Sequence, residues 1–160
     1  MNKRIIIVGP SASGKTFLRK KFEDKGFTFD VSYTSRLMRM GEKQGVHYNF
    51  ISKDEFAFRI SRQAYYEYVE YNGNYYGTGM YEWDNSDCFI METDGIKSIK
   101  PEDRKSCFII YLNPSSFIRI KRMMGERKWD QQEVDDRLAS DDKKFKDFKD
   151  YDIIITNSNF

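Results

Sequence analysis

The sequence predicts an α/β domain in which helices flank a core made of a parallel β-sheet. Continuous apolar runs of strand length cover residues 5–8, 88–91, 107–112 and 153–155, and segments of helical spacing alternate with them. Such runs are typical of strands buried on both faces, as in parallel sheets. A loop of small residues follows the first run, at the carboxyl end of a strand, where ligands of these folds bind.

Length and composition indicate one domain and exclude several functional classes. The chain has 160 residues and a net charge of +2, too small to indicate nucleic-acid binding by bulk electrostatics. It contains no run approaching the ~20 apolar residues of a transmembrane helix. The amino terminus lacks the apolar segment of a signal peptide. We therefore expect a cytoplasmic monomer that binds neither nucleic acid nor membrane, with Cys88 and Cys107 as buried, reduced thiols.

The elements of the first third follow from spacing and capping signals. Residues 15–25 carry apolar side chains at helical spacing, and residues 28–31 are a second strand candidate. Ser52 and Glu55 have the spacing of a capping box, which predicts a helix that ends at about Arg62.

The remaining elements complete the alternation of strands and helices. Residues 64–71 and 74–76 are expected to form a hairpin around an Asn72-Gly73 turn. Ser115 can cap a helix that ends at about Met124. An apolar stripe at helical spacing predicts one more helix: Val134, Leu138, Phe145 and Phe148.

The segment from residue 32 to residue 77 interrupts the alternation with strands, a helix and a hairpin. We interpret it as an insertion that forms a small lobe over the carboxyl edge of the sheet. The core then comprises residues 1–31 and 78–160 of a single domain.

Residues 9–16 read G-P-S-A-S-G-K-T and match the phosphate-loop pattern G-x-x-x-x-G-K-[ST]. They follow an expected strand and open an expected helix, the context that makes this pattern specific. Backbone N–H groups of such a loop form an anion nest, Lys15 reaches the β- and γ-phosphates, and the Thr16 hydroxyl can ligate Mg²⁺. The candidate ATP-binding residues here are Gly9, Ser11, Ala12, Ser13, Gly14, Lys15, Thr16 and Phe17.

Arg36 and Arg39 lie three residues apart in a polar loop. They could hold a phosphate with two guanidinium forks, or they could simply belong to a solvated loop. Spacing alone leaves both interpretations open.

Several separate motifs make the sequence resemble the guanylate kinases along almost its whole length. That family has a loop of the form S-x-T-T-R-x-x-R-x-G-E-x-x-G-x-x-Y-x-F. The matching residues here are Ser32, Thr34, Ser35, Arg36, Arg39, Gly41, Glu42, Gly45, Tyr48 and Phe50. The family's acidic strand and N-x-Y-G-[ST] turn correspond to Glu67 and residues 74–78. The resemblance implies a P-loop kinase fold with a small inserted GMP-binding lobe, and the ATP-dependent phosphorylation of GMP or dGMP to GDP or dGDP.

The resemblance also assigns roles to residues of the acceptor lobe. Those that would bind the GMP phosphate are Arg36, Arg39, Tyr48 and Tyr76, and those that would read the guanine are Ser32, Glu67 and Thr78. An ionised Glu67 only accepts hydrogen bonds, which suits the adjacent N1–H and 2-amino donors of guanine and not the N1 lone pair of adenine.

The chain departs from the family near residue 90. Where guanylate kinases usually have D-x-D-x-Q-G, Ile90 replaces the first aspartate and Glu92 the second. An acidic contact toward Mg²⁺ is therefore missing at the first position. Glu92 could face the acceptor site, or it could simply end a buried strand.

Basic residues cluster around the expected helix after Ser115, at Arg119, Lys121, Arg122, Arg127, Lys128 and Arg137. They could form a solvated face. The resemblance implies instead a short lid, about residues 123–137, that closes over the triphosphate with Arg127 and Arg137. Together with Lys15 and Arg39 they would be the catalytic residues, since phosphoryl transfer needs positive charge on the moving group. Arg122 precedes this lid, and Asn157 would lie beside the adenine.

Two alternatives remain open at this stage. The acceptor could be different, as in a broader deoxynucleoside monophosphate kinase or a ribose-phosphate kinase. The chain could also be a guanylate kinase-like binding module that has lost catalysis, although such modules typically lack a working phosphate loop.

Overall fold

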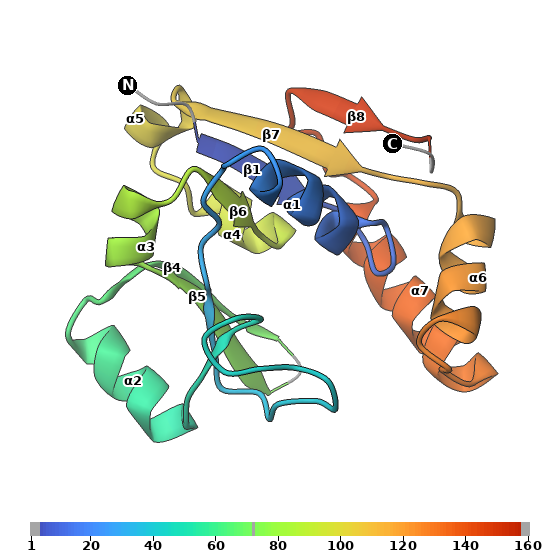
Figure 1. The fold of residues 1–160 in the computed structure, drawn as a ribbon, viewed down its shortest axis with the longest axis horizontal. Coiled ribbons are helices and arrows are strands. Elements are labelled where there is room, and N and C mark those ends of the chain that lie inside the picture. The colour runs from blue at the N-terminus through green and yellow to red at the C-terminus, as the bar shows by residue number, and fades with distance from the viewer. Residues whose placement is uncertain (1–3, 72, 158–160) are drawn as a thin grey trace.

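A four-stranded parallel sheet forms the core of the computed structural model, which describes residues 4–71 and 73–157. Its strand order is β6-β1-β7-β8. The strands are β1 (Arg4–Val8), β6 (Cys88–Ile90), β7 (Cys107–Leu112) and β8 (Ile153–Ile155). The four apolar runs thus form the predicted sheet, which spans the upper part of Figure 1.

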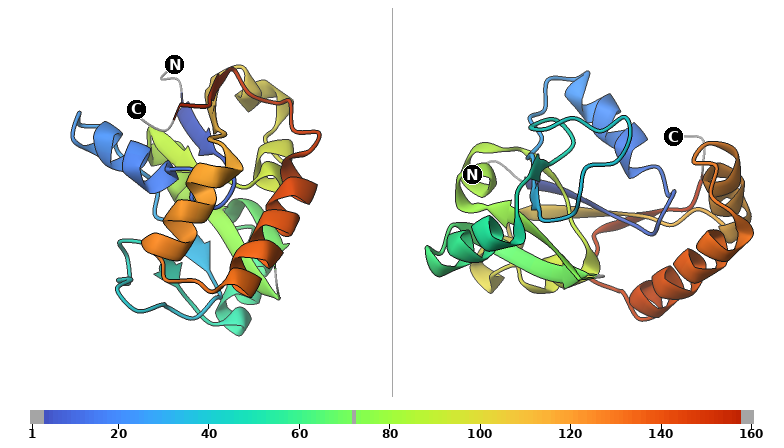
Figure 2. Two further views of the ribbon diagram at one scale, coloured as in Figure 1. Left: turned by 90° about the vertical axis from the view of Figure 1, so that its right-hand side faces the viewer. Right: turned by 90° about the horizontal axis from the view of Figure 1, so that it is seen from below.

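Helices cover both faces of this sheet. On one face, Leu18 and Phe22 of α1 (Lys15–Glu23) pack against the buried side chains of Ile7 and Leu112. On the other, Phe145 packs into the cluster built around Ile6 and Phe89, and it ends α7 (Gln131–Phe145). The views in Figure 2 show α1 and α7 on opposite sides of the sheet. This layering confirms the predicted fold class.

A second four-stranded sheet lies beside the first, with the order β3-β2-β5-β4. The strands are β2 (Tyr33–Thr34), β3 (Asn49–Phe50), β4 (Tyr65–Tyr71) and β5 (Asn74–Gly79). It is mixed, since β2 runs parallel to β3 and antiparallel to β5. The expected boundary between residues 77 and 78 falls inside β5. Asn72 of the predicted turn lies outside the described residues.

The strand predicted at residues 28–31 is wrong. Phe29 forms only an isolated bridge to Cys88, and the next strand begins at Tyr33 in the other sheet. The segment therefore connects the two sheets, and its β-branched residues satisfy spacing without joining a ladder.

The capping box predicted at the start of α2 (Lys53–Ser61) forms only in half. The Ser52 side chain accepts a hydrogen bond from the Glu55 backbone, as expected at an N-cap. The Glu55 carboxylate pairs with Arg59 one turn later, at 2.7 Å.

Three short helices were not predicted, because each spans less than two turns and shows no period. They are α3 (Met80–Asn85), α4 (Thr93–Lys97) and α5 (Pro101–Arg104). The longer helix α6 (Ser116–Gly125) begins after its predicted cap Ser115. Phe148 of the predicted stripe lies beyond the end of α7 but still packs on the core. Among the described helices none is long and apolar enough to cross a membrane.

The second sheet should depend on Phe56, whose side chain is fully buried and stacks on Tyr65 and Tyr75 with centroids 4.4 and 5.2 Å apart. Phe56→Ala should lower the free energy of unfolding by about 3–5 kcal/mol, the usual cost of truncating a buried phenylalanine. Urea titration followed by fluorescence measures this.

Phe58→Ala in the same helix is the matched control, because Phe58 is 61% exposed. It should change stability by less than about 0.5 kcal/mol. Equal losses in the two variants would contradict the placement of α2 on the sheet.

Candidate active site

The phosphate loop lies between β1 and α1 and is shaped by two left-handed residues. Ala12 has φ 58° and Gly14 has φ 104°, and these turns direct the chain into α1, which begins at Lys15. The positive end of the helix therefore faces the loop. Lys15 folds back over it, and its Nζ donates to the carbonyls of Gly9 at 2.5 Å and Pro10 at 3.0 Å.

Burial lowers the pKa of Lys15 from 10.5 to about 8. Glu92 and Asp141 act in the opposite direction, whereas Arg127 and Arg137 lower it further. A buried ammonium among other cations is poorly solvated, so an anionic ligand would be strongly attracted to it.

A buried ion pair fixes the other side of the loop. The Asp141 carboxylate of α7 accepts from the Ser11 backbone N–H at 2.9 Å, and Arg119 of α6 donates both to this carboxylate and to the Ser11 carbonyl. Arg122 donates to the Ala12 carbonyl at 3.0 Å. Two helices from the end of the chain thus bind backbone groups of the loop directly.

Glu42 organises the arginines of the acceptor loop, which comprises residues 35–48 between β2 and β3. Its two carboxylate oxygens accept from the two terminal nitrogens of Arg36, at 2.9 and 2.8 Å, and one of them also accepts from the Arg39 backbone. This pairing raises the pKa of Arg36 and lowers that of Glu42. Arg36 also lies over the ring of Tyr48. Contacts among its own residues therefore hold this loop in place.

Glu67 lies at the base of the cavity, on β4. Its Oε1 accepts from the Thr78 hydroxyl at 2.8 Å and from the Thr78 backbone at 3.2 Å. Burial raises the pKa of Glu67. A Cβ at Gly95 would come within 2.9 Å of Oε2, so this position accepts only glycine without a shift of the carboxylate. Ser32 lines the same cavity and donates to buried Asp30.

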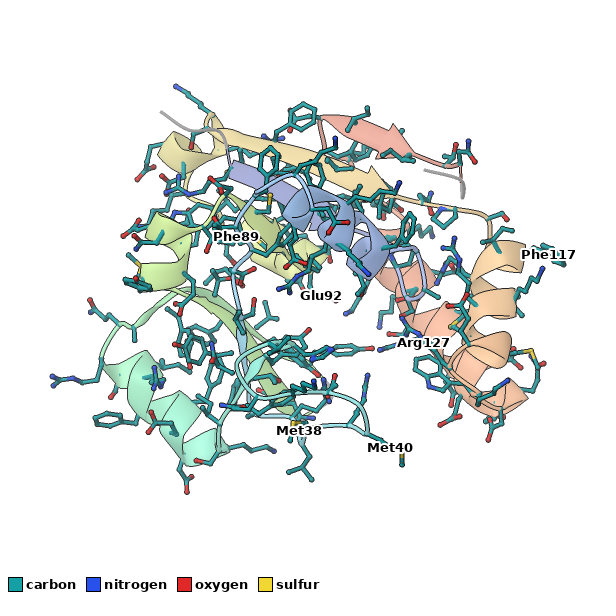
Figure 3. The ribbon with its side chains drawn as sticks, in the orientation of Figure 1. Met38, Met40, Phe89, Glu92, Phe117 and Arg127 are labelled. Atoms are coloured by element: carbon teal, nitrogen blue, oxygen red, sulfur yellow. The ribbon has the colours of Figure 1, made fainter. Side chains whose placement is uncertain are left out.

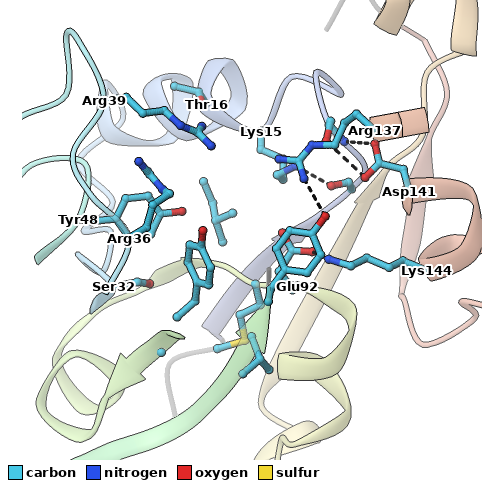
Figure 4. Close-up of a pocket in the computed structure, with 18 of the residues that line it drawn as sticks. Lys15, Thr16, Ser32, Arg36, Arg39, Tyr48, Glu92, Arg137, Asp141 and Lys144 are labelled. Carbon is cyan, nitrogen blue, oxygen red and sulfur yellow. Dashed lines mark hydrogen bonds and ion pairs between the residues drawn. The ribbon is translucent and has the colours of Figure 1, made fainter. Parts of the chain in front are cut away.

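One face of α7 contacts three parts of the site: the end of β4, Glu92 and the phosphate loop. Arg137 donates to the Tyr71 hydroxyl at 2.8 Å, at the end of β4, and Lys144 contacts Glu92 at 3.2 Å. Asp141 lies between Arg137 and Lys144 on the helix and accepts a hydrogen bond from the phosphate loop. Figure 4 shows this face opposite the acceptor loop, with Arg36, Arg39 and Tyr48 across the cavity.

Cationic side chains converge at the mouth of the cavity. Burial and the nearby Arg137 and Arg39 lower the pKa of Arg127. Trp129 lies under both Arg127 and Arg137, with centroid distances of 5.1 and 5.8 Å. In Figure 3, Arg127 and Glu92 approach the same space from the α6–α7 connection and from the edge of the parallel sheet. Such mutual repulsion favours binding of a highly charged anion.

The structure brings most of the predicted site residues to one cavity. These are Gly9, Ser11, Lys15, Thr16, Ser32, Arg36, Arg39, Tyr48, Glu67, Tyr76, Glu92, Arg127 and Arg137. Thr78 is buried behind Glu67, Ala12 and Ser13 are buried within the loop, and Phe17 is 55% exposed on α1. Asn157 follows β8 at the edge of the parallel sheet.

Several residues of the site were not singled out from the sequence, namely Asp30, Tyr71, Asp141 and Lys144. Asp141 and Lys144 follow Arg137 at spacings of four and seven, so helical periodicity could have placed them on the same face. Asp30 and Tyr71 gave no comparable signal, because their roles depend on contacts with distant segments.

The donor set suits Mg²⁺ bound largely through water and phosphate. Thr16 and Glu92 both line the cavity, whereas the described residues form no cluster of three side chains able to hold a metal alone. Mg²⁺ typically retains several waters and uses few protein ligands. The residues present therefore fit this ion.

Comparisons with known proteins agree over the whole chain. A family model described as guanylate kinase matches residues 1–160. The guanylate kinase of Vibrio parahaemolyticus is 32% identical over 166 residues, covering 97% of this chain and 80% of that protein. That of Lactiplantibacillus plantarum is 32% identical over 163 residues, covering 96% and 79%. The crystal structure of guanylate kinase from Anaplasma phagocytophilum has a TM-score of 0.74 at 26% identity, over 98% of this chain and 78% of that one.

Removing the carboxylate of Asp141 should affect both stability and the phosphate loop. Asp141→Ala leaves Arg119 buried without its partner, which should cost about 3–5 kcal/mol of unfolding free energy. Asp142→Ala, on the exposed side of α7, is the control. The double variant Arg119→Met with Asp141→Leu should recover much of the stability, because apolar side chains replace the buried pair. Its KM for the phosphoryl donor should stay raised, because the Ser11 backbone N–H no longer has the Asp141 carboxylate as its partner. A normal KM in the double variant would contradict the anchoring role.

The Lys15 ammonium predicts a pH dependence for donor binding. Below its pKa of about 8 the side chain is charged and attracts phosphate, and above it the neutral amine does not. The kcat/KM for the phosphoryl donor should therefore fall as pH rises above 8, by up to about tenfold per pH unit. Lys15→Arg, which stays charged, should have a lower rate and lose this decline. A profile flat to pH 10 in the native protein would contradict the assignment.

Proposed function

Because this chain belongs to the guanylate kinase family and is a nucleoside monophosphate kinase, we propose that it transfers the γ-phosphoryl group of ATP to GMP or dGMP. One observation carries the proposal. A single cavity is lined both by Lys15 and Thr16 of the phosphate loop and by Glu67 and Arg39 of the acceptor side. Donor and acceptor can therefore meet without crossing solvent.

Transfer requires positioning and charge rather than a base. The phosphate of a nucleoside monophosphate is already ionised at neutral pH, so one of its oxygens can attack the γ-phosphorus directly. Lys15, Arg127 and Arg137 supply positive charge around the equatorial oxygens of the moving group, where an arginine can contribute about 10³–10⁵ in rate. Arg39 lies on the acceptor side of the same cavity and holds the attacking phosphate.

Thr16 would hold Mg²⁺ together with the phosphates, and the ion would neutralise charge that develops on the leaving group. Because Ile90 stands where the family usually has an aspartate, water and Glu92 are the remaining oxygen donors on that side.

The acceptor site should favour a purine base that presents two adjacent donors. Glu67 uses Oε1 for the hydroxyl and the backbone N–H of Thr78, which fixes the carboxylate plane and leaves the two lone pairs of Oε2 for the base. Guanine satisfies them with N1–H and its 2-amino group, whereas adenine would leave a buried carboxylate unpaired.

Glu67→Gln tests the assignment. The native protein should prefer GMP to AMP by about 10²-fold or more in kcat/KM, because the hydrogen bonds to a charged group and the desolvation cost add. The amide adds a donor and removes the charge, so kcat/KM for GMP should fall and the gap to AMP should narrow.

Glu70→Gln is the matched control, since Glu70 lies on the same strand and is exposed. It should leave both rates unchanged. If the native protein uses AMP or a pyrimidine monophosphate as efficiently as it uses GMP, the assignment of guanine recognition to Glu67 is wrong. The protein would then be a kinase with a broader range of acceptors.

A further inference from the structure

We propose that Asp30 acts through Ser32 as a specificity-determining positioning residue, and that guanine binds together with one proton taken up by Asp30. The inference rests on the proposed function, because it concerns the base of the acceptor nucleotide. Asp30 itself lies behind the cavity wall and has no place in the phosphate loop or the lid.

The geometry begins with a buried carboxylate behind a hydroxyl. Asp30 is 4% exposed, and its Oδ2 accepts a hydrogen bond from the Ser32 hydroxyl. The Asp30 backbone is fixed as well, since its N–H donates to the Cys88 carbonyl at 3.0 Å. Ser32 lines the cavity together with Glu67. The hydroxyl thus lies between a buried acid and the space for the base.

A count of hydrogens shows why this matters for guanine. The base presents N1–H and the 2-amino group as donors, and O6 as an acceptor. Glu67 can take the two donors, and the Thr78 hydroxyl hydrogen is used on Glu67. The hydrogen of Ser32 is used on Asp30. None of the three residues assigned to the base, Ser32, Glu67 and Thr78, therefore has a side-chain hydrogen left for O6.

Protonation of Asp30 resolves the mismatch. A hydroxyl has one hydrogen and two lone pairs. When Asp30 is ionised, Ser32 turns a lone pair toward O6, and two acceptors face each other. When Asp30 takes a proton from solvent, the neutral carboxyl donates to Ser32 Oγ and the Ser32 hydrogen turns to O6.

The surroundings of Asp30 allow its carboxylate to take up a proton near neutral pH. The titratable and charged groups that face it are Arg19 from α1, Glu67 from β4, Glu82 from α3, Tyr48 from the acceptor loop and Cys88 from β6. Burial is the largest effect and raises the pKa of Asp30 to about 7, and Glu67 and Glu82 act in the same direction. Ser32 and Arg19 oppose the rise.

Calorimetry of GMP binding at pH 8.5, in buffers of different ionisation enthalpy, counts the protons. The native protein should take up about one proton more per GMP than Asp30→Asn, because the asparagine amide can donate to Ser32 without protonation. Asp30→Asn should also bind GMP about 30-fold more tightly at this pH, since only about 3% of native Asp30 is protonated. The two affinities should converge at pH 6.

Ser32→Ala provides a second variant in case Asp30→Asn fails to fold. It removes the hydroxyl that connects the acid to the base, so the extra proton should disappear while GMP binding weakens. Asp24→Asn, at an exposed position that ends α1, should behave as the native protein does.

Equal proton uptake and equal affinity in the native protein and Asp30→Asn would overturn the role of Asp30 and leave the kinase assignment intact. Retention of the extra proton in Ser32→Ala would overturn the path through Ser32. If GMP fails to bind the native protein, the acceptor assignment falls and the inference falls with it.

Discussion

The shape of the site depends on the buried ion pair between Arg119 and Asp141. Both partners also bind Ser11, one at its carbonyl and the other at its N–H, so the phosphate loop is held from outside by α6 and α7. A buried pair adds little to stability compared with apolar side chains, but its loss is costly. The effect of this pair is to hold the phosphate loop in a single conformation. Arg137 lies one turn before Asp141 on the same helix, so the contact that fixes the loop also sets the position of a catalytic candidate.

Several ionisable groups of the site are buried, and burial disfavours their charged forms. Lys15 and Arg127 have lowered pKa values, whereas those of Glu67 and Asp30 are raised. Each shift marks a group whose charge or proton a ligand would stabilise. Anionic groups of a ligand would stabilise the cations at the mouth of the cavity, and hydrogen-bond donors would suit the carboxyl groups at its bottom. Aromatic packing offsets part of this cost, as where Tyr66 stacks on Trp83 with centroids 3.7 Å apart.

The sequence could predict what depends on local pattern. Strands β1, β7 and β8 are continuous apolar runs, and the phosphate loop has a fixed spacing, so both follow from neighbouring residues. The strand expected at residues 28–31 was wrong because pairing is decided by distant segments. The same limit applies to the site. Glu67 could be assigned by resemblance, but the Asp30 carboxylate behind Ser32 and the Arg137 contact with Tyr71 exist only after the two sheets and α7 meet.

The central claim is that the anchored loop and the acceptor sheet together transfer a phosphoryl group to a guanine nucleotide. Incubation with [γ-³²P]ATP, Mg²⁺ and GMP, followed by separation of the nucleotides, tests it directly. The account predicts label in the β-phosphate of GDP, formed far faster than labelled inorganic phosphate and lost in Lys15→Ala. Label that appears only as inorganic phosphate, or that enters AMP as readily as GMP, would contradict it.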